Sequence, residues 1–199
     1  MYPLPKIGII IGTTRPGRRA DGLAAWLLEL AQKRGDALFE LVDLRDYPIP
    51  FFEEANAPAF GPPQGTVAQR WTQKMAELDG YVFLTAEYNH SVSAVLKNAL
   101  DHLFPEVQRK PAAFLGYGAN GGTRAVQHLK HILGELQMAS LRYAVHIGKT
   151  EIIGLMAEGK TMADYPYLGE AATAMLDDLV WWTNTLRTGR QQQVEAEAA

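Results

Sequence analysis

Short apolar runs alternate with helical patterns along most of this chain. Five runs are rich in β-forming residues and predict strands, at residues 7–11, 39–44, 80–84, 112–116 and 141–147. The runs at 7–11 and 80–84 are almost continuously apolar, which is typical of parallel strands buried on both faces.

Apolar residues in the segments between these strands recur at the spacing of one helical face. Five helical patterns are present, over residues 23–30, 67–78, 96–101, 126–136 and 168–182. Strands that alternate with helices in this way predict a parallel sheet with helices on both faces, linked by right-handed crossovers.

Three stretches lack such a period. Residues 47–65 are rich in proline and aromatic residues, and connectors of this length are often lids or binding loops. Residues 148–165 are expected to be irregular. The end of the chain becomes polar and low in complexity from Gln191 on, which predicts disorder. We therefore expect one domain over residues 1–188 and a disordered tail over residues 189–199.

Size and composition are those of an ordinary globular domain, with 199 residues, 47% hydrophobic and 21% charged. A net charge of -3 argues against a nucleic-acid-binding surface. The absence of cysteine excludes disulfides, thiolate metal ligands and cysteine nucleophiles. The first residues lead straight into a strand, unlike a signal peptide, and no apolar stretch approaches the about 20 residues that cross a bilayer. We expect a cytoplasmic protein with neither nucleic-acid nor membrane partners.

Hydroxyl and cationic side chains follow the first strand. This segment begins Gly12-Thr13-Thr14-Arg15 and continues to Arg18 and Arg19 before a helix. Backbone N–H groups at a helix start, together with arginines, predict a phosphate site. The segment is neither a P-loop nor a dinucleotide fingerprint, so a monophosphate ester on a flat ring suits it better. The alternative is a Gly-Pro turn with solvated arginines.

A second polar cluster follows the strand at residues 80–84, at the sheet edge where ligands bind in α/β proteins. It contains the carboxylate of Glu87, the ring of Tyr88 and the carboxamide of Asn89. With free backbone N–H groups, these could form a floor for a flat, polar-edged ligand such as a flavin ring. The alternative is that Tyr88 packs, while Asn89 and Ser91 form turns and cap the next helix.

A third loop follows the strand at residues 112–116. Gly118, Gly121 and Gly122 allow the backbone to approach a ligand closely and to reach positive φ. A glycine-rich loop is weak evidence alone. Its position beside the second cluster makes it a candidate wall of the same site.

Other candidates carry less chemistry. His128 and His131 could share a metal, but without a third ligand nearby they more often form a solvated helix surface, and we predict no metal site. His90 could hydrogen-bond substrate or the phosphate of NAD(P)H. Helix packing can hide only one of Trp181 and Trp182, so the other is a candidate for a subunit interface.

Together, the segments 12–15, 87–91 with 96–101, and 118–122 resemble the NAD(P)H-dependent FMN reductase family. These flavodoxin-like flavoproteins include quinone and azo-dye reductases. The resemblance covers about residues 7–147, and its specific part is the middle motif. It implies a flavodoxin-like α/β three-layer sandwich with strand order 2-1-3-4-5. The chain departs from the family at Ala86, where proline is usual, and at Thr13, where serine is usual.

The resemblance also implies the site. Residues of the first loop would hold the FMN phosphate, and those of the other two loops would border the isoalloxazine. The implied cofactor-binding residues are Gly12, Thr13, Thr14, Arg15, Arg18, Ala86, Glu87, Tyr88, Asn89, Tyr117, Gly118, Gly121 and Gly122.

The implied activity is NAD(P)H-dependent reduction of bound FMN, followed by reduction of a quinone, azo compound, free flavin or metal oxyanion. NADPH or NADH would be the donor, and the family implies a homodimer or homotetramer. No protein acid, base or nucleophile is expected, because the cofactor supplies the chemistry. One alternative is an electron-carrier flavodoxin that binds a protein partner without turnover of its own. Another is an interaction protein that has lost its flavin.

Overall fold

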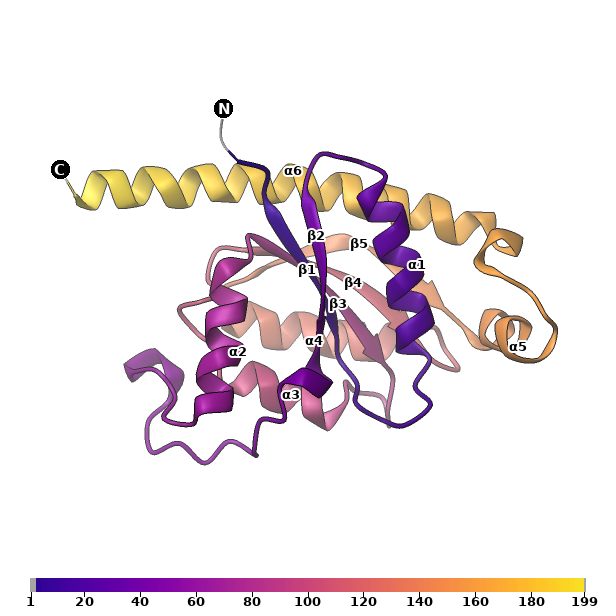
Figure 1. The fold of residues 1–199 in the computed structure, drawn as a ribbon, viewed down its shortest axis with the longest axis horizontal. Coiled ribbons are helices and arrows are strands. Elements are labelled where there is room, and N and C mark those ends of the chain that lie inside the picture. The colour runs from indigo at the N-terminus through magenta and orange to yellow at the C-terminus, as the bar shows by residue number, and fades with distance from the viewer. Residues whose placement is uncertain (1–2, 199) are drawn as a thin grey trace.

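Five parallel strands form one sheet in the order β2-β1-β3-β4-β5. The computed structural model describes residues 3–198 (Figure 1). The strands are β1 (Lys6–Ile11), β2 (Leu38–Asp43), β3 (Gly80–Ala86), β4 (Pro111–Tyr117) and β5 (Ala139–Ile147). β3 and β4 are buried along their whole length, as their apolar sequences predict. The predicted α/β class and flavodoxin-like strand order are confirmed.

Helices cover both faces of the sheet, as expected. On one face, α1 (Ala20–Gln32) and α6 (Pro166–Glu197) pack on strand residues that include Ile9 and Val82. On the other face, α2 (Thr66–Glu77), α3 (Ala94–Asp101) and α4 (Thr123–Glu135) pack on residues that include Ile10 and Phe83. Adjacent residues of a strand point to opposite faces, which is how one apolar run supplies both cores.

One helix lies where the sequence predicted irregular structure. α5 (Lys149–Ala157) follows β5 directly, and the Glu151 carboxylate accepts a hydrogen bond from the Gly148 N–H at 2.8 Å, which caps the helix start. A glycine inside a short helical pattern argues against a helix. Here Gly154 is required by packing, because a Cβ at this position would lie 1.8 Å from the hydroxyl of Tyr165. The expectation for residues 148–165 was therefore wrong over α5, and the described residues form six α-helices.

The predicted disordered tail was also wrong, as far as the described residues extend. α6 continues through Arg190 to Glu197, and Figure 1 shows its last turns reaching beyond the sheet. Residues 190–197 are mostly good helix formers without glycine or proline. The guanidinium of Arg190 donates to the Arg109 carbonyl at 2.8 Å and pairs with Asp79 at 3.2 Å. Low complexity here reflects helical composition rather than disorder. Residue 199 lies outside the described residues.

The long connector after β2 has no α-helix or strand, as predicted. Residues 44–65 contain only two short 3-10 turns, η1 (Leu44–Asp46) and η2 (Pro58–Phe60). Phe51 and Phe60 along it are 79% and 83% exposed, so much of its apolar surface lies in solvent.

Candidate functional site

Three segments meet at the carboxyl edge of β1, β3 and β4, which are neighbours in the sheet. We call them the first loop (residues 12–19), the middle turn (residues 87–91) and the glycine loop (residues 118–122). The backbone joins the first and second of these strand ends, since the Gly12 N–H donates to the Leu84 carbonyl at 2.9 Å. The predicted grouping of three loops at one edge is therefore present.

Gly12 is required by close packing. A Cβ at this position would lie 2.9 Å from both the Leu84 carbonyl oxygen and Cδ2 of Leu96, which no other residue could occupy without a shift of backbone. The hydroxyl of Ser93 donates to the Gly12 carbonyl and also accepts from the Leu96 N–H, which caps α3. The cap of this helix is thus Ser93, not Asn89 or Ser91.

The backbone of the first loop presents free hydrogen-bond donors. Within residues 3–198, the N–H groups of Thr13, Thr14 and Arg15 have no hydrogen-bond acceptor. The Thr13 side chain is buried, and its Oγ1 lies 3.5 Å from the Tyr117 hydroxyl. Consecutive unpaired N–H groups just before a helix form a site for an anion.

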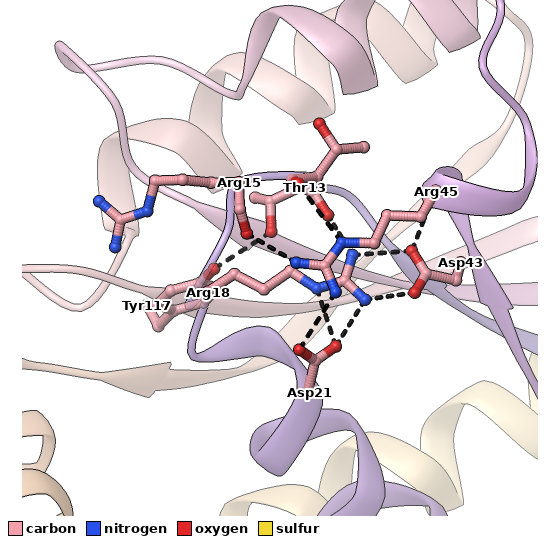
Figure 2. Close-up of polar contacts among 8 residues, drawn as sticks. Thr13, Arg15, Arg18, Asp21, Asp43, Arg45 and Tyr117 are labelled. Carbon is pink, nitrogen blue, oxygen red and sulfur yellow. Dashed lines mark hydrogen bonds and ion pairs between the residues drawn. The ribbon is translucent and has the colours of Figure 1, made fainter.

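Arg18 shapes this loop instead of facing solvent. Its side chain is 1% exposed, and its guanidinium donates to Asp43 at 2.7 Å, to Asp21 at 2.8 Å and to the Thr13 carbonyl (Figure 2). The hydrogen bond to Asp43 raises the pKa of Arg18, so its charge is permanent and already matched. The structure therefore contradicts the expectation that Arg18 contacts a phosphate.

Arg45, in the η1 turn just after β2, supports the first loop. Its Nη2 donates to the Arg15 carbonyl at 2.7 Å and its Nε to the Thr14 carbonyl at 3.3 Å. With the Thr14 carbonyl occupied, the Arg15 N–H on the other side of the same peptide is left for a ligand, whereas the Arg15–Pro16 peptide has no N–H. The sequence analysis did not single out Arg45, because it lies 30 positions from the carbonyl it holds.

Arg19 lines a hollow between α1 and α5, so Arg15 is the cation of the first loop that remains available beside the loop's unpaired N–H groups. It is exposed, and its guanidinium has no hydrogen bond or ion pair to any residue between 3 and 198. Figure 2 shows its side chain extending away from the cluster of Arg18, Asp43 and Arg45, on the side where Tyr117 lies. The predicted role of Arg15 is compatible with this position.

The middle turn is a tight two-residue turn. Tyr88 and Ser91 exchange backbone hydrogen bonds of 2.9 and 3.0 Å, with Asn89 and His90 between them at φ of 50° and 68°. Tyr88 is 37% exposed, so its ring does not pack as the alternative interpretation expected. Ala86 is buried as the last residue of β3.

The Glu87 carboxylate points away from this floor. Its side chain is 5% exposed and accepts from Nε of Arg124 at 2.5 Å and from the Arg124 N–H at 3.1 Å. The N-cap of α4 is Gly122, which has no side chain, so Glu87 caps that helix from another segment. The Glu87 N–H donates to the Tyr117 carbonyl at 3.0 Å, so only the Glu87 carbonyl is left for a ligand, and the expectation of a carboxylate at the floor was wrong.

The glycine loop folds tightly back onto β4. Gly122 has φ of 67°, and a Cβ there would lie 2.4 Å from the Tyr117 nitrogen. Gly121 has φ of 68°, and its carbonyl accepts a hydrogen bond from His146 at 2.9 Å. Packing of the loop itself thus explains both glycines. Gly118, the first residue of the loop, is half-buried and packs against Glu87, since a Cβ on Gly118 would lie 3.2 Å from Cβ of Glu87.

Asn98 connects α3 to the long connector. Its carboxamide oxygen accepts from the Phe52 N–H at 2.9 Å, and its nitrogen donates to the carbonyls of Pro50 at 2.8 Å and Ile49 at 3.3 Å. A cavity of about 440 Å³ lies here, between the connector, α3 and Thr14 of the first loop. The sequence analysis noticed the motif around Asn98 but not this function.

The two helical histidines do not form a metal site. The His128 Nδ1 lies 2.7 Å from the Ser91 hydroxyl. Nowhere in residues 3–198 do three or more His, Asp or Glu side chains gather in a way that could hold a metal ion. The same part of the chain contains no helix with the length and apolarity needed to span a membrane.

Comparison with known proteins identifies the family of this fold. Residues 5–151 match the model of the NADPH-dependent FMN reductase family. An NAD(P)H-dependent FMN reductase of Schizosaccharomyces pombe is 38% identical over 136 residues, which cover 67% of this chain and 68% of that protein. An NADPH:quinone oxidoreductase of Arabidopsis thaliana is 34% identical over 135 residues, or 65% of this chain and 67% of that protein.

The solved structures agree in fold. The flavoenzyme NAD(P)H:(acceptor) oxidoreductase of Paracoccus denitrificans superposes with a TM-score of 0.66 at 20% identity, covering 92% of this chain and 98% of that one. At this identity the likeness concerns the fold alone.

Proposed function

Because the chain belongs to the NADPH-dependent FMN reductase family and is therefore an FMN-dependent oxidoreductase, we propose that its three loops hold one FMN. The observation that carries this placement is the first loop. It combines the unpaired N–H groups of Thr13, Thr14 and Arg15 with the exposed guanidinium of Arg15. Three donors and one free cation are suited to a phosphate monoester.

In this proposal the first loop binds through its backbone, the hydroxyl of Thr14 and the side chain of Arg15. Gly12 permits the approach of β1 to α3, and Arg18 keeps the loop in shape without touching the phosphate. Thr13 contributes its N–H, while its buried hydroxyl faces Tyr117.

The ring would lie between the middle turn and the glycine loop. Backbone groups of residues 86–89 and the ring of Tyr88 form its floor, and Tyr117, Gly118, Gly121 and Gly122 form its border. Glu87 contributes backbone only, since its carboxylate is bound to Arg124.

When bound, FMN supplies the hydride acceptor for NAD(P)H and the electron source for a second, small-molecule acceptor. The protein contributes binding, orientation and an open stacking face, so no side chain is assigned as acid, base or nucleophile. The quinone reductase named among its relatives supports a quinone as the acceptor class. The exposed connector 47–65 would form a wall of that face, in its own subunit or in a neighbouring one.

We further propose residues 1–188 as the FMN-binding domain of a cytoplasmic homodimer or homotetramer. Exposed apolar side chains support an assembly. Trp181 on α6 is 60% exposed, and Phe51 and Phe60 on the connector are still more exposed. Sedimentation of the purified protein measures this directly, and a monomer at micromolar concentration would contradict it.

The activity is tested by NADPH oxidation with a small quinone as the sole acceptor. The expected result is sustained turnover with FMN present and no protein partner. An electron-carrier flavodoxin would turn over slowly under these conditions, and a scaffold without flavin would not turn over at all. The net charge of -3 and the free Arg15 speak against the carrier, which is typically strongly acidic.

A further inference from the structure

The middle turn contains two residues in an unfavourable conformation. Asn89 and His90 both have left-handed φ, at 50° and 68°. Such φ values are uncommon outside glycine, although asparagine and histidine adopt them more readily than most residues. Such conformations persist where surrounding contacts enforce them, and they are frequent at ligand sites. The contacts that enforce this turn come from α4.

Arg124, in the first helical turn of α4, contacts the middle turn at Glu87 and His90. Its Nη1 lies 2.7 Å from Nε2 of His90, while its Nε and backbone N–H both donate to Glu87. A guanidinium has donors only, so Nε2 of His90 accepts this hydrogen bond. One arginine therefore links the residue before Tyr88 to the second left-handed residue.

His128 lies one helical turn further along α4 and contacts the middle turn at Ser91. Its Nδ1 is 2.7 Å from the hydroxyl of Ser91, the residue that closes the turn by pairing with Tyr88. Positions four apart share one helix face, so Arg124 and His128 contact the middle turn from the same face of α4. His131 is also exposed on α4, but it has no hydrogen bond or ion pair to the described residues.

The same helix begins at the glycine loop. Gly122 is the N-cap of α4, and a Cβ on Gly118 would lie 3.2 Å from Cβ of Glu87. α4 is therefore a rigid element attached to both segments that border the proposed ring site. A change in the hydrogen bonds between α4 and the middle turn therefore alters the spacing and shape of that site.

We propose that Arg124 and His128 are positioning residues, which hold Asn89 and His90 in the left-handed conformation that the flavin floor requires. The effect on flavin rests on the proposed FMN site, whereas the effect on the turn does not. Neither residue needs to touch the ring, and both act through Glu87, His90 and Ser91.

Amide hydrogen exchange of the protein without FMN tests directly whether Arg124 and His128 hold the middle turn in its conformation. The Tyr88 and Ser91 N–H groups are hydrogen-bonded across the turn, so their exchange reports on its opening. We expect Arg124→Lys to speed this exchange about tenfold, as for the loss of a hydrogen bond to a charged group. His128→Gln, which changes an exposed hydrogen bond, should speed it several-fold. His131→Gln, the matched control on the same helix, should leave it unchanged.

Arg124→Lys keeps a cation beside Glu87 but lacks the fork that reaches Glu87 and His90 together. Glycine adopts left-handed φ without cost. In His90→Gly, residue 90 therefore no longer needs the contact with Arg124 to hold this conformation. We expect Arg124→Lys to weaken FMN binding about tenfold when residue 90 is histidine, and by less than about twofold in the His90→Gly background. The visible spectrum of bound FMN should shift in the first case only.

A merely structural role of Arg124 would produce the same loss in both backgrounds, with a lower melting temperature and unchanged exchange at Tyr88 and Ser91. That result would overturn the proposal. Faster exchange in the variants, combined with no FMN binding by the unaltered protein, would support the positioning role and overturn the FMN site instead.

Discussion

Nη1 of Arg18 lies 2.7 Å from Oδ1 of Asp43, and this ion pair fixes the first loop to the end of β2. The Arg18 side chain is 1% exposed and that of Asp43 is 24% exposed. Arg15, three positions earlier, is exposed and free. Two arginines of one short loop thus have opposite functions, one structural and one available to a ligand.

Removal of Arg18 should destabilise the protein. Arg18→Met leaves Asp43 half-buried without its partner, and breaking a buried pair in this way costs about 3 kcal/mol of unfolding free energy. The double variant Arg18→Met with Asp43→Leu should recover part of that loss, because Asp43 no longer carries a charge, and Asp21 is 53% exposed and keeps Arg45 at 3.6 Å. Urea unfolding measures both. A single variant as stable as the unaltered protein would refute the structural function of Arg18.

Removal of Arg15 should affect binding and not folding. Arg15→Ala is expected to weaken FMN binding by about 1.5 kcal/mol or more, the value of a charge-assisted hydrogen bond, with unfolding free energy within about 0.5 kcal/mol of the unaltered protein. Riboflavin, which lacks the phosphate, should bind both proteins equally. Arg19→Ala is the control, because Arg19 lines a hollow between α1 and α5. Equal losses for FMN and riboflavin would contradict the phosphate assignment.

Asn98 should control the order of the long connector. Asn98→Ala removes three hydrogen bonds to residues 49–52, and the freed segment should be cleaved several-fold faster by a protease of broad specificity. Lys97→Ala is the control, since the Lys97 side chain forms a surface pair with Asp101 and no other ion pair within residues 3–198. Cleavage at equal rates in the two variants would show that Asn98 does not anchor the connector.

Lys110 should make stability depend on pH. It is 7% exposed, and its Nζ donates to the carbonyls of Ala76 and Met75 at the end of α2. Burial, with the nearby charge of Arg190, lowers the pKa of Lys110 to about 8. Between this value and the about 10.4 of an unfolded lysine, the unfolded chain binds more protons, so stability should rise with pH.

Urea unfolding from pH 8 to 9.5 measures this dependence. The expected slope is on the order of 1 kcal/mol per pH unit in the unaltered protein, and smaller in Lys110→Met. The comparison uses slopes because Lys110→Met also leaves two carbonyls without donors, which lowers stability at every pH. Identical slopes would mean that Lys110 keeps an ordinary pKa.

The sequence predicted the sheet because its central strands are recognisable locally. Residues 7–11 and 80–84 are apolar on both faces, and such runs fold as buried strands wherever they lie. α5 was missed because Gly154 argues locally against a helix, while the contact with Tyr165 that requires this glycine comes from elsewhere. The end of α6 was missed because its polar, low-complexity sequence is typical of disorder, although the same residues are good helix formers.

The sequence predicted that the three loops meet at one edge of the sheet, but not the side-chain contacts within them. The segments at the carboxyl edge followed from strand order, yet Arg15 and Arg18 look alike in the sequence. Asp43, 25 positions away, pairs with Arg18 together with Asp21, and these contacts separate the functions of the two arginines. The Glu87 carboxylate likewise turns toward Arg124, 37 positions away. Long-range pairs of this kind have no periodic signal, so one sequence alone does not reveal them.

The most direct test of the central claim is an anaerobic absorption titration of the purified protein. FMN is added first, then NADPH, and finally a small quinone. The account predicts a flavin spectrum shifted from that of free FMN, bleached by NADPH and restored by the quinone. A spectrum identical to free FMN, with no bleaching at stoichiometric NADPH, would contradict it.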